Sequence, residues 1–121
     1  MNTAQNQVLQ DGKTTKRTLP YERQYVIVAM YEVLDKNGAD YEKTDFSTVS
    51  SDMSVYGNKS RFSISVNERK AGTELSVTML RPCEWLSPSG VQRAITAVAD
   101  SISQYLENEL ATNAVSPLSN T

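Results

Sequence analysis

Side chains that commonly carry out chemistry are scarce in this sequence. Its 121 residues include no histidine and only one cysteine, Cys83. Without histidine, the chain cannot assemble a Ser-His or Cys-His nucleophile pair, and Cys83 has no second cysteine or histidine with which to bind zinc. We therefore expect no catalytic residue, no metal site and no cofactor within the chain. We interpret Cys83 as a small apolar residue.

Carboxylates form the only other cluster of side chains that could carry out catalysis or bind a metal. Asp40, Glu42 and Asp45 lie close together in the sequence, and Asp52 follows soon after. They occupy expected turn and strand positions where acidic side chains are ordinarily solvated, so their spacing supports neither general acid-base catalysis nor a calcium site. No glycine-rich motif of the kind that cradles phosphate is present.

Large amphipathic side chains near element boundaries are the remaining candidates, and they suit a protein interface. Trp85 is the only tryptophan, and Arg81 precedes it by four residues. Trp85 could anchor an interface or cap the core. The tyrosines of the first expected helix could form a dimer contact, or they could lie at the edge of the core with their hydroxyls in water. The candidate interface residues are Trp85, Arg81, Tyr21, Tyr25 and Tyr31.

Two helices and three strands would position these residues. Pro20 is suited to open a helix and Asn37-Gly38 to end one, and the apolar residues between them recur at helical spacing, which predicts a helix over residues 20–36. The β-formers around Tyr25 leave a strand as the alternative. A second helix is predicted over residues 88–110, with Ser87 as its N-cap and a long apolar stripe behind it.

Between the helices the apolar residues alternate with polar ones, which is typical of strands with one buried face. The alternation runs through Val49–Val55, then Phe62–Val66, then Leu75–Met79, and a polar turn at residues 68–72 predicts a hairpin between the last two. Residues 41–48 either extend the first strand or precede it. The polar face, with Ser63, Ser65, Ser76 and Thr78, is either a flat platform for a partner or a solvated surface.

The expected fold is therefore an α+β two-layer sandwich of order α-β-β-β-α, in which two helices cover one face of an antiparallel three-stranded meander. At this length we expect one domain, residues 19–111. Residues 1–18 and 112–121 contain few sizeable apolar residues, so we expect both ends to be disordered.

Charge and hydropathy limit the partners. Twelve basic and fourteen acidic residues give a net charge of −2, which provides no long-range attraction for nucleic acid. No apolar stretch is long enough to span a membrane, and no signal sequence is recognisable. We expect a soluble cytoplasmic protein; if a signal peptide has been removed, the alternative is the cell envelope or periplasm.

The Tyr56-Gly57 turn, the segment RFSISVNERKAGTELSVTM and the Ser-Gly opening of the last helix carry a resemblance. Over residues 20–110 the chain resembles small uncharacterised bacterial domains with a helix, a short meander and a C-terminal helix, several of which look like envelope lipoproteins or accessory domains. It departs from them by lacking an N-terminal lipid-attachment cysteine. The resemblance implies a fold and a bacterial source, and it implies no catalytic residue.

These observations favour a non-catalytic protein-binding or assembly module, whose partner is another protein or a second copy of the chain in a homo-oligomer. The alternative is a small-ligand or lipid carrier with an apolar pocket between helices and sheet. A cavity lined by Phe62, Ile64, Val77 and Ile102 would favour the carrier, and dense packing there would oppose it. An enzyme would need active-site residues from another subunit.

Overall fold

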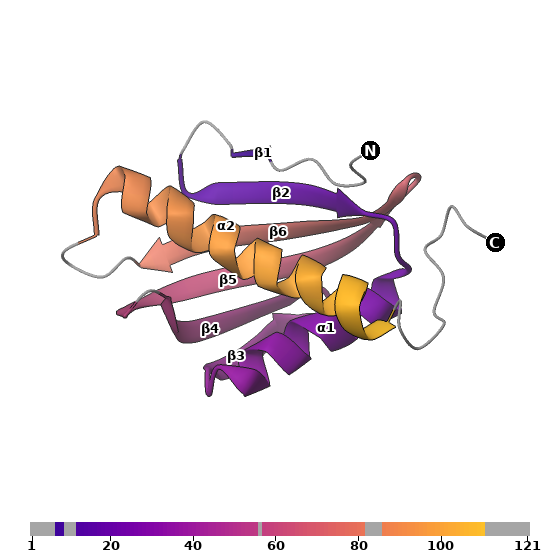
Figure 1. Ribbon diagram of the computed structural model, residues 1–121, viewed down its shortest axis with the longest axis horizontal. Helices are drawn as coiled ribbons and strands as arrows, with labels where there is room; N and C mark the ends of the chain where they lie inside the picture. The colour runs from indigo at the N-terminus through magenta and orange to yellow at the C-terminus, as the bar shows by residue number, and fades with distance from the viewer. Residues whose placement is uncertain (1–6, 9–11, 56, 82–85, 111–121) are drawn as a thin grey trace.

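A computed structural model describes residues 7–8, 12–55, 57–81 and 86–110. These residues form one antiparallel sheet, and two helices lie across one of its faces (Figure 1). The strands are β1 (Gln7–Val8), β2 (Thr14–Leu19), β3 (Asp40–Asp45), β4 (Thr48–Val55), β5 (Asn58–Arg69) and β6 (Gly72–Arg81). The helices are α1 (Arg23–Lys36) and α2 (Pro88–Tyr105), and a π-helical turn, η1 (Leu106–Leu110), continues α2.

The strand order across the sheet is β1-β2-β6-β5-β4-β3. The α+β class is confirmed. The three expected strands are β4, β5 and β6, which pair in that order, but they form only part of a larger sheet and not a three-stranded meander. The expected order α-β-β-β-α is wrong. Three further strands flank the three expected ones, with β1 and β2 on one side of them and β3 on the other.

Five of the six residues of strand β2 lie within residues 1–18, where we expected disorder. It pairs with β6 along its whole length, from Thr14 opposite Thr78 to Leu19 opposite Thr73. Its inward side chains are Thr15, Arg17 and Leu19, all buried. Two of these three are polar, so the strand lacks the apolar alternation that marks β5 and β6. The expected C-terminal tail, residues 112–121, lies outside the described residues.

Strand β3 settles the open alternative for residues 41–48, because it is a separate strand that precedes β4. All six of its residues are exposed. It pairs with β4 from Asp40 opposite Asp52 to Asp45 opposite Thr48, with a register shift between Lys43 and Asp45. A strand with no buried residue carries no hydrophobic alternation, which is why the sequence pattern did not predict β3 as a separate strand.

Helix α1 begins three residues later than predicted, because Pro20 and Tyr21 precede it as a bend rather than opening it. Thr73 donates its hydroxyl to the Tyr21 carbonyl over 2.7 Å, which holds this segment against β6. The predicted end is confirmed. Asn37 is the C-cap, Gly38 takes a left-handed φ of 62°, and the Ala39 N–H donates to the Leu34 carbonyl over 3.0 Å.

Helix α2 begins as predicted. The Ser87 side chain accepts a hydrogen bond from the Gly90 N–H over 3.1 Å, and Pro88 occupies the first turn. The apolar stripe faces the sheet, with buried residues Val91, Ala94, Ile95, Val98, Ala99 and Ile102. The α-helix ends at Tyr105, and the π-helical turn carries the same segment on to Leu110.

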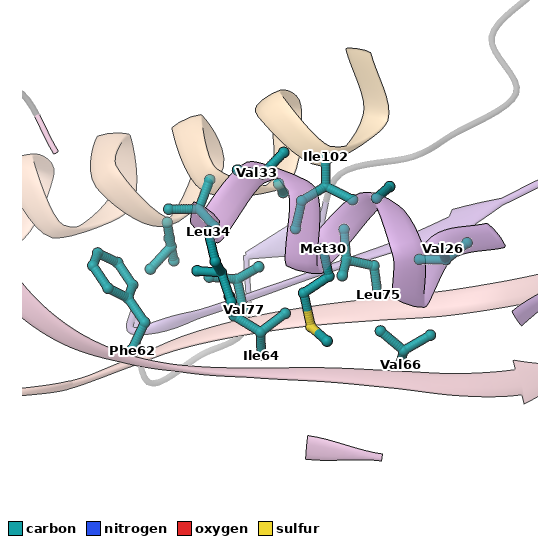
Figure 2. Close-up of a cluster of buried hydrophobic side chains, with 14 of the residues drawn as sticks. Val26, Met30, Val33, Leu34, Phe62, Ile64, Val66, Leu75, Val77 and Ile102 are labelled. Atoms are coloured by element: carbon teal, nitrogen blue, oxygen red, sulfur yellow. The ribbon is translucent and has the colours of Figure 1, made fainter. Parts of the chain in front are cut away.

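The core lies between the two helices and the sheet. Side chains from α1, β5, β6 and α2 meet there (Figure 2). Phe62, Ile64, Val77 and Ile102 have no exposed surface. At one end of this layer Gly72 has a φ of 144°, and a Cβ there would collide with the Leu19 carbonyl oxygen. Glycine therefore lets the start of β6 approach the end of β2.

The opposite face of the sheet carries short polar side chains. Ser63 lies between Ser50 and Thr78 in the strand register, and Thr14 lies beyond Thr78. The hydroxyls of Thr14 and Thr78 are 2.9 Å apart. Side-chain hydroxyls on this face therefore bond to each other across strands.

Candidate functional site

Phe46 is the most exposed of the large apolar side chains that the structure describes, with 76% of its surface accessible. It lies in the two-residue turn between β3 and β4. The Ser47 N–H donates to the Asp45 carboxylate over 2.8 Å, which orders this turn. An aromatic ring is thus held in solvent at a defined position.

Arg23, the first residue of α1, fixes Phe46 to the rest of the fold. Its Nη2 donates to the Phe46 carbonyl over 3.1 Å, and its Nε donates to the Val66 carbonyl over 3.2 Å. Its guanidinium carbon also lies 4.3 Å from the centroid of the Phe46 ring, which is a cation-π contact. One side chain therefore ties the turn to both α1 and β5.

Two hollows adjoin this pair of residues. A broad, polar one of about 850 Å³ lies between the start of α1, the β3–β4 turn and the β5–β6 hairpin, and Arg69 lies on its wall. A smaller one of about 150 Å³ lies between α1 and the β3–β4 hairpin, and its lining includes Ile27, Met30 and Val49. Phe46 and Arg23 line both hollows.

Tyrosines continue the surface along α1. The rings of Tyr31 and Tyr41 are 5.4 Å apart and tilted by 51°. Tyr41 donates its hydroxyl to Asp35 over 3.0 Å, and this hydrogen bond is the largest cause of a raised pKa at Tyr41. Val28, three residues before Tyr31 and so on the same side of the helix, is also exposed. We name Arg23, Val28, Tyr31, Tyr41 and Phe46 the corner surface.

The structure brings one of the five predicted interface residues, Tyr31, into the corner surface. Tyr25 is half-buried against the core, and Tyr21 is buried. Arg81 is exposed at the far end of β6, opposite Arg61 in the register. Trp85 lies outside the described residues, as does Cys83.

Sequence reasoning missed Arg23, Phe46 and Tyr41. Phe46 carried a usable signal, because an isolated aromatic residue between Asp45 and Ser47 has no apolar neighbour with which to form a buried stripe. Nothing in the sequence links Arg23 to a residue 23 positions later. That link depends on the tertiary packing of α1 beside the β3–β4 turn.

The carboxylates lie apart from any buried reaction site. Asp40, Glu42 and Asp45 are exposed on β3. Asp52 forms an ion pair with Arg61 over 3.1 Å. Among the residues that the structure describes, no group of three or more acidic, cysteine or histidine side chains could hold a metal ion.

Tyr21 has a structural role that pH can test. Burial, with a smaller contribution from the charge of Glu107, raises the pKa of its hydroxyl above the ordinary value of 10.0. Unfolded Tyr21 therefore ionises at a pH where folded Tyr21 stays neutral, so its stabilisation is complete below about pH 10 and is lost above it. We expect the melting temperature of Tyr21→Phe to fall less than that of the wild type between about pH 9 and pH 11. Equal falls in calorimetry would contradict this.

Comparison with known protein families and with curated proteins finds no significant match to this chain. Within the described part of the chain, neither helix combines the length and the apolar character that crossing a membrane requires.

Proposed function

We propose that this chain is a non-catalytic protein-binding module and that its partner binds the corner surface. The observation that carries the proposal is Phe46, an aromatic ring held in solvent by the hydrogen bonds and cation-π contact of Arg23. An exposed ring contributes no free energy of burial to folding, but it can contribute that free energy when a partner covers it. Interface hot spots are commonly preorganised aromatic anchors of this kind, set beside pockets.

The composition of the corner surface supports this assignment. Aromatic residues and arginine are enriched in protein interfaces, and the corner surface contains three aromatic residues and one arginine. The ring is also held in place before binding, so little conformational entropy would be lost when a partner covers it.

The carrier alternative gains no support from the packing. Phe62, Ile64, Val77 and Ile102, which would line its pocket, have no exposed surface. None of them lines either hollow beside Phe46, and none lines two further surface hollows that lie between α1 and α2. An apolar ligand between helices and sheet would have to displace these side chains.

Replacing Phe46 tests the proposal. The full chain isolates its partner from native extract, and the purified partner is then titrated against the wild type, Phe46→Ala and Leu80→Ala. We expect Phe46→Ala to weaken binding by about 30-fold or more, as loss of a hot spot does. Leu80 is the matched control, because it is apolar and 52% exposed but lies on β6. Wild-type affinity for Phe46→Ala, or an equal loss for Leu80→Ala, would reject the corner surface.

A further inference from the structure

Strand β3 is an open edge of the sheet. It is the last strand in the order, its six residues are exposed, and among the described residues only β4 pairs with it. In an edge strand every second residue directs its N–H and C=O groups away from the sheet, where they can pair with another extended chain.

The register shows which side chains of β3 lie on which face. Asp40 and Glu42 lie opposite Asp52 and Ser50, whereas Tyr41 and Lys43 lie opposite Ser51 and Val49. Val49, like Met53, belongs to the core beneath the helices. Directly opposite residues share a face, so Asp40 and Glu42 lie on the uncovered face, and Tyr41 and Lys43 lie on the helix-covered face.

An added strand would meet different chemistry on these two faces. On the uncovered face its side chains would lie beside the carboxylates of Asp40 and Glu42. On the other face they would lie beside Tyr41, whose ring contacts Tyr31, and near the exposed flank of α1 that carries Val28. Acidic neighbours favour basic side chains, and the aromatic and aliphatic flank favours apolar ones.

Charge argues against a second copy of the chain as the added strand. Strand β3 has three acidic residues, Asp40, Glu42 and Asp45, and one basic residue, Lys43, which gives a charge of −2. In a symmetric antiparallel pairing centred on Tyr41 or Glu42, Glu42 would lie opposite Asp40 or Glu42 of the other copy. Like charges directly opposite are destabilising, so these two central registers are disfavoured for a second copy, whereas a basic strand would meet no such repulsion from Asp40 and Glu42.

From these observations we infer that the partner of the corner surface contributes an extended segment of alternating basic and apolar residues, which pairs with β3 as a seventh strand of the sheet. This inference rests on the proposed function and specifies its partner. The new backbone hydrogen bonds supply affinity, and the alternating side chains supply specificity. Phe46, in the turn directly after β3, then covers one end of the added strand.

Peptides test the inference directly on the full chain. The probe is a hexapeptide of alternating lysine and valine with both ends blocked, and the readout is the shift of backbone amide resonances during titration. We expect the shifts to concentrate in residues 40–45 and to diminish with added salt. A glutamate-valine hexapeptide, and a lysine-valine hexapeptide methylated at alternate amides, should each bind weakly or not at all.

Charge reversal supplies the matched variants. Glu42→Lys should weaken binding of the lysine-valine peptide by roughly fivefold and improve binding of the glutamate-valine peptide. Glu107→Lys makes the same change in net charge on the exposed surface of η1 and should leave the affinity unchanged. Shifts absent from residues 40–45, equal binding of both peptides, or dimerisation through β3 in sedimentation would overturn the inference. If Phe46→Ala still loses the native partner in that event, the proposed function stands and strand addition alone fails.

Discussion

Ile64→Ala and Ile102→Ala are each expected to lower the free energy of unfolding by about 2–5 kcal/mol. Ile64 lies on β5 and Ile102 on α2, and neither has any exposed surface. Both belong to the single core between helices and sheet (Figure 2). Truncation removes buried methylene and methyl groups and leaves a cavity that packed neighbours fill only in part.

Urea denaturation followed by circular dichroism measures these losses. Val28→Ala is the matched control, because Val28 is aliphatic and helical but 48% exposed, and we expect its effect to stay within about 0.5 kcal/mol. An unchanged slope of unfolding free energy against urea would show that the denatured state is unaltered. Losses below about 1 kcal/mol at both isoleucines would mean that the strand register is wrong.

The central elements were predictable because their local patterns agree with their tertiary surroundings. Phe62, Ile64 and Val66 alternate with polar residues, and the fold buries them on one side of β5. Ser87 and Pro88 mark the start of α2, and its stripe is buried against the sheet. Where one face is buried and the other is wet, periodicity alone identifies the element.

The flanking strands were not predictable from the same signal. The inward positions of β2 include Thr15 and Arg17, and Arg17 depends on Asp100, 83 residues later, as its ion partner. Strand β3 buries nothing and is defined by its pairing with β4. Hydrophobic periodicity cannot identify a strand whose buried side chains are polar or whose side chains are all exposed to water.

The corner surface was predicted only at Tyr31. The expectation that amphipathic side chains near element boundaries would matter led to α1, yet Tyr21, which precedes α1, is a core residue. The proposed anchor, Phe46, is held in place by Arg23, and their contact forms only when α1 packs beside the β3–β4 turn. Long-range pairs of this kind carry no local sequence pattern.

Arg17 is the only charged residue among the buried ones that the structure describes. Its side chain is 8% exposed, and its Nη2 lies 2.8 Å from a carboxylate oxygen of Asp100, whose side chain is 50% exposed. Its Nη1 donates to the Ser103 hydroxyl over 2.9 Å, and its Nε has no hydrogen-bond partner within the part of the chain that the structure describes. This ion pair links β2 to α2.

The unequal burial of the two partners predicts an unequal response to mutation. Asp100→Ala leaves the guanidinium buried, with Ser103 as its one remaining side-chain partner among the described residues, so we expect a loss of about 3 kcal/mol. Arg17→Met leaves Asp100 in contact with water and Ser103 still bonded to the Ala99 carbonyl over 3.0 Å. It also removes the unpartnered Nε and substitutes apolar surface, so we expect a change within about 1 kcal/mol.

A double-mutant cycle by urea denaturation separates these effects. Because Arg17→Met leaves no buried charge for Asp100 to neutralise, Arg17→Met combined with Asp100→Ala should be about as stable as Arg17→Met alone. Asp100→Asn, which keeps a hydrogen-bond acceptor but removes the charge, should fall between Asp100→Ala and the wild type. If Arg17→Met instead costs more than Asp100→Ala, then the buried guanidinium stabilises the fold by more than its desolvation costs, and the expected asymmetry between the two partners is reversed.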